Sequence, residues 1–139
     1  METRPTKQVI IIRKGICGSR GKEISQGAHA SMGALLSIFK KEREKVGVLT
    51  YCQWSLEKEE DDAISLWLNN CFTKITLVVE TEQELRDLEL IAKGANLPHA
   101  LITDNGKTVF KGIPTVTALA IGPWWSEEID KITGHLKLY

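Results

Sequence analysis

The chain has 139 residues, 42% of them hydrophobic and 26% charged, which suits one soluble globular domain with its own core. Eighteen basic and eighteen acidic side chains give a formal net charge of zero, which excludes binding of nucleic acid through global charge. No apolar run is long enough to cross a membrane, so no transmembrane helix is expected.

The cysteines argue for an intracellular protein. Cys17, Cys52 and Cys71 lie far apart and match no metal-ligand spacing. Their odd number, together with a polar N-terminus unlike a secretory leader, favours reduced thiols. We therefore expect a cytoplasmic protein that holds no metal and contacts no membrane.

The first part of the chain predicts a strand, a glycine-rich loop and a helix. Residues 8–13 form a continuous β-branched apolar run, typical of a strand covered on both faces. The loop over 14–21 lacks the Gly-Lys-Ser/Thr ending of a phosphate-binding P-loop. Lys22 closes this loop and opens a helix over roughly 23–41.

This helix is rich in small residues. A glycine inside a helix costs about 1 kcal/mol relative to alanine, so Gly27 and Gly33 predict a close approach to a sheet or to another chain. Helical spacing predicts an inward stripe made of Ile24, Ala28, Ser31, Leu35 and Ile38.

A polar row is expected at the start of the same helix. Lys22, Gln26 and His29 fall at spacings of four and three residues, which places them on one face. Taken singly, each has an ordinary explanation: a surface lysine, a surface glutamine, or a histidine that is hydrogen-bonded in the core.

The middle of the chain has the weakest pattern. The charged run over 40–43 most simply ends the helix in a solvated face, and 46–54 predicts either a short strand or a loop. Residues 57–62 are acidic. Residues 63–68 then predict an amphipathic helix that two asparagines stop.

A strand and a capped helix follow. Residues 73–79 predict the second strand of the sheet. Thr81 and Glu84 have the spacing of a capping box, and Gly94 is placed to end the helix. The buried face of this helix is expected to hold Leu85, Leu88 and Ala92.

The C-terminal part predicts two strands joined by a tight connection, then a helix. A third strand over 98–103 delivers Asp104 to an Asn-Gly turn, and a fourth strand over 116–121 pairs antiparallel with it. Gly122 and Pro123 are expected to break that strand. The last helix is expected to run from a Ser126 cap through Thr133, with Ile129 and Ile132 packing inward. The elements together predict a single-domain α/β fold, a three-layer sandwich with a mixed, mainly four-stranded sheet flanked by helices.

Four segments resemble one known family. Residues 21–30 resemble the GKxxxQxxHA segment of the second class of peptidyl-tRNA hydrolases, and residues 101–108 its LIxDxGxT segment. Residues 115–123 match its TVTxLxIGP segment, and 129–139 look like its C-terminal end. The similarity covers about 8–39 and 73–139, whereas 40–72 is diverged and enlarged.

The resemblance implies a hydrolase without metal or other cofactor, often a homodimer, that cleaves the ester between a peptide or N-blocked amino acid and tRNA. It implies catalytic roles for Lys22, Asp104, Thr108 and Thr117, with Gln26 and His29 as neighbours. The family's RxDLxM stretch is altered, because Gly15, Cys17 and Gly18 stand at its characteristic positions. These departures affect the substrate loop and put substrate preference and rate in question.

Ester hydrolysis needs a positioned water, help in removing its proton, and donors for the developing oxyanion. Asp104 is expected to orient or deprotonate the water, and Lys22 to supply positive charge. The hydroxyls of Thr108 and Thr117 are expected to complete the donors or hold the water. A Ser-His-Asp triad is not evident, so water attack is preferred to an acyl-enzyme.

Binding of tRNA needs a local basic patch on this neutral chain. Residues in the loops at one end of the sheet are expected to form it, and the tRNA-contacting set comprises Arg13, Arg20, Gln26, His29, Lys107 and Lys111, with Lys14 also nearby. The pair Trp124-Trp125 either stacks on a base or, more simply, packs against the last helix or a second subunit.

Two other interpretations stay open from sequence alone. The altered loop and acidic middle segment are compatible with a catalytically weak relative that serves as a tRNA-binding, RNA-binding or protein-interaction module. A small-ligand enzyme that reuses the fold is also possible in principle. The retained Lys22, Asp104, Thr108 and Thr117 favour the hydrolase over this third interpretation.

Overall fold

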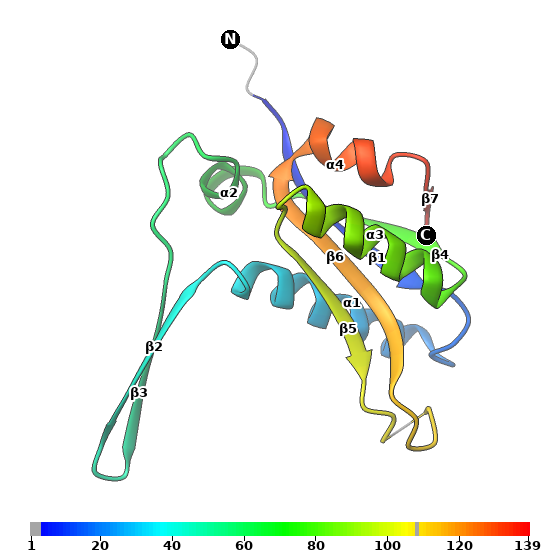
Figure 1. Ribbon diagram of the computed structural model, residues 1–139, viewed down its shortest axis with the longest axis horizontal. Coiled ribbons are helices and arrows are strands. Elements are labelled where there is room, and N and C mark those ends of the chain that lie inside the picture. Colours follow the sequence, from blue (N-terminus) through cyan, green and yellow to red (C-terminus); the bar gives the residue numbers. More distant parts are fainter. Residues whose placement is uncertain (1–3, 108) are drawn as a thin grey trace.

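The computed structural model describes residues 4–107 and 109–139 (Figure 1). Along these residues the elements are β1 (Thr6–Arg13), α1 (Arg20–Leu36), β2 (Lys40–Val46), β3 (Leu49–Ser55), α2 (Ala63–Leu66), the π-helical η1 (Trp67–Cys71), β4 (Lys74–Val79), α3 (Glu82–Gly94), β5 (His99–Asp104), β6 (Thr115–Trp125), α4 (Ser126–Thr133) and β7 (Lys137–Leu138). None of the helices described combines the length and apolar character needed to cross a membrane.

The main sheet is mixed and has the strand order β5-β6-β1-β4-β7, while β2 and β3 form a separate hairpin. β1 pairs parallel with β4 and antiparallel with β6. β5 pairs antiparallel with β6, as predicted, and the two-residue β7 adds an edge next to β4. The predicted α/β class is confirmed, and β7 makes the sheet one short strand wider than expected.

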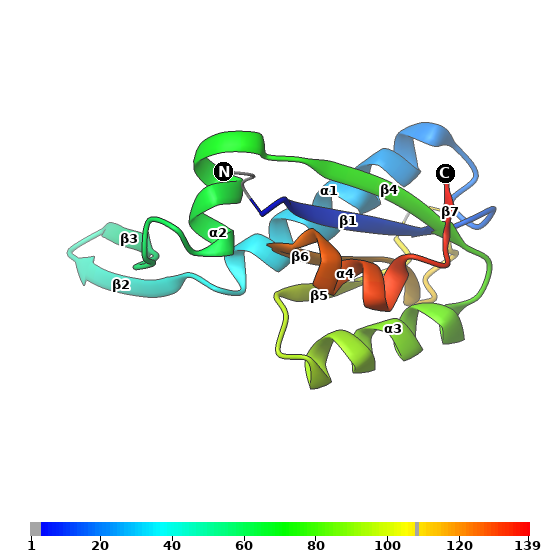
Figure 2. The ribbon, with the colours of Figure 1, turned by 90° about the horizontal axis from the view of Figure 1, so that it is seen from above.

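The sheet is covered on both faces, which gives three layers (Figure 2). α1 lies on one face, and α3 and α4 lie on the other. Side chains alternate along β1 accordingly: Val9 and Ile11 belong to the core cluster with α3 and α4, while Ile12 packs with Ala30 and Ala34 of α1. The continuous apolar run in β1 therefore reflects a strand buried on both faces.

The inward face of α1 differs from the predicted stripe. Its buried residues are Gln26, Gly27, Ala30 and Ala34, whereas Ile24 is 71% exposed. The helix is turned so that small residues meet the alanine-rich surface of β5 and β6, and the larger apolar side chains lie along its edge. The sequence periodicity alone did not fix this rotation, because small residues carry a weak hydrophobic signal.

Close approach of α1 to the sheet explains its glycines, as expected. A Cβ on Gly33 would lie 3.0 Å from Cβ of Ala100, and one on Gly27 would lie 3.3 Å from Cγ2 of Ile10. Both distances are tighter than ordinary van der Waals contact. Larger residues would push the helix off the sheet and weaken the dispersion contacts beneath it.

The segment after α1 is a hairpin, which corrects the predicted helix end. α1 ends at Leu36, and the charged run begins β2 instead of closing the helix. The alternative of a short strand over 46–54 is close to β3, which starts at Leu49. Gly47, with φ +61°, allows the tight reversal between the two strands.

The helix predicted over 63–68 continues further. α2 passes directly into η1, so the two asparagines lie inside the helical segment, which ends where Phe72 takes a φ of +53°. Trp67 is fully buried, and its Nε1 donates a hydrogen bond to the carbonyl of Thr73 over 2.7 Å. This anchor holds the segment beside the start of β4.

The predictions for α3 are confirmed. Thr81 and Glu84 form the capping box, the predicted apolar face is buried, and the helix ends at Gly94. Asn96 then takes a left-handed φ of +58°. Asparagine tolerates this conformation, which lets the chain turn back into β5.

β6 runs through the predicted break at Gly122 and Pro123 and ends at Trp125. Gly122 has φ +99°, and a Cβ there would lie 2.7 Å from the carbonyl oxygen of Lys7. A register shift in the pairing with β1 accommodates this irregularity, so the strand continues on the other side.

Ser126 does not cap α4 with its side chain; it is the first residue of the helix, and Trp125 occupies the cap position. Ile129 and Ile132 are buried as predicted. Both tryptophans are engaged within the protein: Nε1 of Trp124 donates to Glu128, and the Arg4 guanidinium lies 4.1 Å from the ring centroid of Trp125.

Candidate active site

The polar residues of the motifs lie close together at one end of the strands of the main sheet. β1 and β5 run in the same direction because both pair antiparallel with β6. The C-terminal ends of β1 and β5 therefore lie at the same end of the sheet, together with the N-terminus of α1 and the connection from β5 to β6. We call this end of the strands the catalytic edge. Asp104 ends β5, and Lys22 lies in the first turn of α1.

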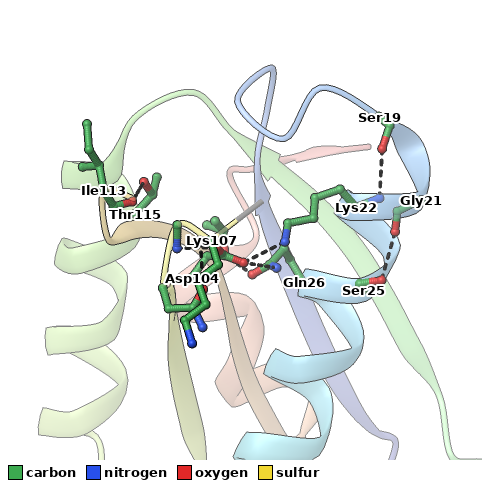
Figure 3. Close-up of polar contacts among 12 residues, drawn as sticks. Ser19, Gly21, Lys22, Ser25, Gln26, Asp104, Lys107, Ile113 and Thr115 are labelled. Carbon is green, nitrogen blue, oxygen red and sulfur yellow. Dashed lines mark hydrogen bonds and ion pairs between the residues drawn. The ribbon is translucent and has the colours of Figure 1, made fainter. Parts of the chain in front are cut away.

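Asp104 accepts hydrogen bonds from two side chains of α1 and from one backbone amide of the connection that follows β5 (Figure 3). Its Oδ2 accepts from Nζ of Lys22 over 2.8 Å and from Nε2 of Gln26 over 3.0 Å, and its Oδ1 accepts from the backbone amide of Gly106 over 2.8 Å. The side chains of Lys22 and Asp104 are 21% and 10% exposed. The lysine and the aspartate thus face a shared, partly solvent-accessible space.

The turn after Asp104 depends on Gly106. This residue has φ +81°, and an added Cβ would lie 2.5 Å from the backbone oxygen of Ile113. The carbonyl of Gly106 also accepts from the amide of Gly112 over 2.7 Å. The glycine therefore lets the connection fold closely enough for its own amide to reach the carboxylate.

The first turn of α1 is fixed by a cap. Ser19 is the N-cap, and its Oγ accepts from the amide of Lys22 over 3.2 Å. The helix consequently starts at Arg20, earlier than predicted. Sequence reasoning missed Ser19, although a serine three residues before Lys22 is the spacing of an N-cap contact.

Gln26 and Thr117 form a buried pair behind the carboxylate. The hydroxyl of Thr117 donates to Oε1 of Gln26 over 2.6 Å, and the two residues are 0% and 1% exposed respectively. Because the carbonyl end of the amide is taken by Thr117, its NH₂ end points at Asp104. The sequence predicted both residues but not their contact.

These contacts make Asp104 a stable anion. The hydrogen bond from Lys22, followed by that from the Gly106 amide, holds the pKa of Asp104 below its ordinary value of 3.8, against a smaller opposing effect of desolvation. The carboxylate is therefore ionised at neutral pH and acts as an acceptor only.

The predicted tRNA-contacting cations lie at this same edge. Arg13 ends β1, Arg20 begins α1, and Lys107 and Lys111 are exposed in the connection between β5 and β6. Arg13 is half-buried; its Nη1 donates to the carbonyl of Val116 over 3.2 Å, and its buried Nε finds no partner among the described residues.

Two residues of the predicted tRNA-contacting set are placed differently from each other: His29 lies apart from the contacts of Asp104, whereas Gln26 takes part in them. His29 is exposed, and no described hydrogen bond links it to Lys22 or Gln26. Gln26, predicted to contact tRNA, is instead buried and hydrogen-bonded to protein on both ends of its amide. Thr108 lies outside the described residues.

The altered loop before α1 contains a buried thiol. Cys17 is 1% exposed, and its pKa is raised by burial and, to a lesser extent, by Glu23. It is therefore a neutral, buried thiol within the loop. Across residues 4–107 and 109–139, no three His, Cys, Asp or Glu side chains are grouped so that they could hold a metal ion.

Comparison with known proteins agrees with the motif resemblance. The family described as "Peptidyl-tRNA hydrolase PTH2" matches residues 6–139. A peptidyl-tRNA hydrolase of Methanocaldococcus jannaschii is 36% identical over 132 residues, which cover 95% of this chain and 98% of that protein. One of Methanopyrus kandleri is 37% identical over 132 residues, covering 95% of this chain and 97% of the relative.

A eukaryotic relative is similar over one part of its length. A probable peptidyl-tRNA hydrolase 2 of Dictyostelium discoideum is 35% identical over 133 residues, which cover 96% of this chain and 54% of that protein. The similarity to archaeal relatives therefore extends over essentially whole chains, and the similarity to the Dictyostelium protein over about half of it.

Proposed function

This chain belongs to the peptidyl-tRNA hydrolase PTH2 family, and from that premise we propose that a water molecule held beside Asp104 attacks the ester of the substrate. Membership makes the chain an enzyme that hydrolyses the ester bond of peptidyl-tRNA. The interpretation as a catalytically weak binding module is not favoured, because the relatives matched over whole chains carry the name of the hydrolase. The roles of individual residues are our proposal.

Asp104 orients the water. A carboxylate has about four lone-pair sites, and the contacts with Lys22, Gln26 and the Gly106 amide use three of them. The remaining site can accept a hydrogen bond from water that reaches the exposed part of the side chain. Because its pKa is lowered, Asp104 is a weak base at neutral pH, so it contributes orientation more than proton abstraction.

Lys22 supplies the positive charge. Attack forms a bond from the water oxygen to the ester carbon and places negative charge on the former carbonyl oxygen, which an ammonium stabilises. Breaking the ester bond then leaves the terminal ribose oxygen of the tRNA, which takes up the proton lost by the water. The Nζ of Lys22 lies 2.8 Å from Oδ2 of Asp104, which supports placing the ammonium beside the proposed water and the reacting carbonyl.

Gln26 and Thr117 are positioning residues in this proposal. Their side chains are buried, and the hydrogen bond from the Thr117 hydroxyl fixes which end of the Gln26 amide meets Asp104. Holding catalytic groups in one geometry removes an entropic cost from the reaction step. Thr108, predicted from the motif, remains a candidate donor to the substrate.

Arg13, Arg20, Lys107 and Lys111 bind the phosphates nearest the ester. They lie at the same sheet edge as Asp104, which makes this edge locally basic on a chain of zero net charge. His29 remains a more peripheral candidate, because it is exposed further along α1. We also propose that the enzyme acts in the cytoplasm.

Self-association is a further part of the proposal. A groove of about 710 Å³ lies beside α1 and over β1 and β4, lined by apolar groups that include Ile10, Ile24 and Met32. Ile24 and Met32 are 71% and 55% exposed, and a second copy would cover them. Light scattering of the wild type and of Ile24→Asp tests this homodimer; a monomeric wild type would contradict it.

The single observation that carries the proposed mechanism is the convergence of Lys22, Gln26 and Gly106 on Asp104. The test is release of free tRNA from N-acetyl-aminoacyl-tRNA by the wild type and by Asp104→Asn. We expect the wild type to release tRNA and the variant to be slower by about 100-fold or more, because the neutral amide holds neither the lysine nor the water in the same way.

Two results would contradict this proposal in different ways. Binding of tRNA without ester cleavage by the wild type would favour an RNA-binding module. Cleavage at the wild-type rate by Asp104→Asn would leave the activity intact but remove the role given to the carboxylate.

A further inference from the structure

The β2–β3 hairpin stands away from the three-layer body (Figures 1 and 2). The pairing runs over the full length of both strands, from Lys40 opposite Ser55 to Val46 opposite Leu49. Apart from the partly buried Ser55, each residue of the two strands is exposed. The hairpin therefore contributes little to the core, and its side chains are available to a partner.

The register sorts the charges of the hairpin onto two faces. Side chains alternate along a strand, and residues directly opposite each other share a face. One face carries Lys41, Arg43 and Lys45, whose partners on β3 are Trp54, Cys52 and Thr50. We call these six residues the basic face; it contains three cations and no acidic side chain.

The other face is different in character. It holds Glu42 and Glu44, and Lys40 is paired there with Glu42 over 3.0 Å. The alternating sequence of β2 thus places its acidic residues and one neutralised lysine on one side. The three remaining cations form a row on the opposite side.

We propose that the basic face binds the sugar-phosphate backbone of the tRNA part of the substrate, at a distance from the ester. The inference rests on the proposed function and adds a second contact region to it. Successive cations in the row are two residues apart, or about 7 Å along the strand. This spacing is similar to that of neighbouring phosphates along one nucleic-acid strand, so a single stretch of backbone can meet all three.

The position of the hairpin fits a long substrate. It follows the C-terminal end of α1, whereas Lys22 lies in the first turn of the same helix. A helix of 17 residues is about 25 Å long, so only an extended substrate such as an RNA duplex can touch both places. Figure 1 shows the hairpin and the β5–β6 connection projecting toward the same side of the molecule.

The acidic segment that follows the hairpin does not neutralise the positive charge of the basic face. Residues 57–62 contain five acidic side chains and one lysine. They follow β3 and lead back toward α2, while the tip of the hairpin projects in the opposite direction. An RNA lying along the basic face therefore meets the row of cations, while the acidic segment lies beyond the base of the hairpin.

An anionic membrane is the competing partner. Val46, Val48 and Leu49 at the tip are exposed apolar residues, which a lipid surface would also accept. Charge complementarity along the whole strand favours a linear polyanion instead. A membrane would be met by the tip, whereas Lys41, Arg43 and Lys45 extend along β2 toward the body.

The test compares two variants with equal loss of charge. The first combines Lys41→Gln, Arg43→Gln and Lys45→Gln. The matched control combines Lys58→Gln, Lys93→Gln and Lys131→Gln, which are exposed residues outside the hairpin and the catalytic edge. Affinity for deacylated tRNA is measured over a range of salt concentrations. The kcat/KM values are then compared for full-length N-acetyl-aminoacyl-tRNA and for the same ester on a short 3′-terminal oligonucleotide.

We expect the hairpin variant to bind tRNA on the order of 10-fold more weakly and to lower the slope of log affinity against log salt by about 2 to 3. The ratio of kcat/KM for full-length over short substrate should fall by a similar factor. The control should keep the wild-type slope and ratio. Replacing residues 41–54 by a short Gly-Ser linker should reproduce the defect of the triple variant.

Three outcomes would overturn the inference. The hairpin variant could behave like the control, or it could lose full-length and short substrates equally. It could also retain tRNA binding while losing binding to vesicles of phosphatidylcholine and phosphatidylserine, which would identify a membrane contact. Failure of the wild type to cleave even the short ester would instead contradict the proposed function, and the tRNA affinities would still test the hairpin.

Discussion

The carboxylate of Asp104 is held by two side chains and a backbone amide, whereas the cations along β2 project into solvent from a hairpin that stands away from the core. The two regions also differ in what supports them. Behind Asp104 lies the buried pair of Gln26 and Thr117, whereas the residues of β2 and β3 are exposed apart from the partly buried Ser55.

This contrast separates two tasks within one substrate. Hydrolysis needs atoms fixed to within a fraction of an ångström, which a network of buried hydrogen bonds provides. Recognition of a long polyanion needs spaced charges that remain solvated until the partner arrives, and their contribution weakens as salt is added. Substitutions at the two regions should therefore change different measured quantities.

Lys22→Ala should give the largest effect on the reaction step. We expect kcat to fall about 100- to 1,000-fold, because the substitution removes the ammonium that stabilises developing negative charge. Single-turnover hydrolysis of N-acetyl-aminoacyl-tRNA measures the change. Lys93→Ala, an exposed residue on α3, is the matched control and should leave kcat as in the wild type. A kcat for Lys22→Ala within threefold of the wild type would contradict the role of Lys22.

Thr117→Val should have a smaller effect on kcat and a measurable effect on stability. The substitution keeps the shape of the side chain but leaves Oε1 of Gln26 without its buried donor, at a cost of about 1–3 kcal/mol in the free energy of unfolding. Gln26 then loses its fixed orientation, and we expect kcat to fall about 10-fold with little change in KM. Thr117→Ser keeps the hydroxyl and should restore kcat. Loss of kcat in both variants would show that the hydroxyl contact is not the cause.

The site was more predictable than the surfaces around it. Lys22, Asp104, Gln26 and Thr117 were identified because their motifs are specific, and the structure brings all four together. The geometry of the contact from the Gly106 amide depends on how the connection folds against Ile113, which the side-chain motif does not specify. Side-chain motifs reveal the participants, and only the tertiary fold reveals their hydrogen bonds.

The hairpin shows why the middle of the chain was misassigned. Lysine, glutamate and arginine favour helices. The charged residues at the start of β2 were therefore assigned to the C-terminal end of α1. Its strand conformation comes from pairing with β3, which carries strand-favouring residues such as Thr50, Tyr51 and Trp54. The rotation of α1 was misassigned for a related reason, because contact with the sheet decides which of its small residues are buried.

Lowering the pH should reduce the free energy of unfolding, because it protonates the carboxylate of Asp104. The pKa of this carboxyl is lowered by folding, so its contribution to stability is complete above the ordinary value of 3.8 and is lost as the pH falls through the lower folded value. Urea unfolding of the wild type and of Asp104→Asn measures this over about pH 2–7. The difference in free energy of unfolding should be constant near neutral pH and should shrink below about pH 4.

Lys22→Ala provides the internal control for that experiment. The hydrogen bond from Lys22 is the largest cause of the lowered pKa, so its removal should bring the pKa of Asp104 back toward 3.8 and reduce the acid-dependent change. A pH dependence identical in the wild type and in Asp104→Asn would show that the carboxylate does not contribute in this way.

Replacing residues 41–54 by a short Gly-Ser linker should have the smallest effect on stability. Both strands are exposed and none of their residues belongs to either core cluster, so we expect the free energy of unfolding to change by less than about 1 kcal/mol. Thermal unfolding of the two chains measures the difference. A loss as large as that of Thr117→Val would mean that the hairpin supports the body, and its charges would then have to be interpreted as part of the scaffold. A small change, combined with weaker binding of tRNA, would instead separate the region that holds the substrate from the region that cleaves it.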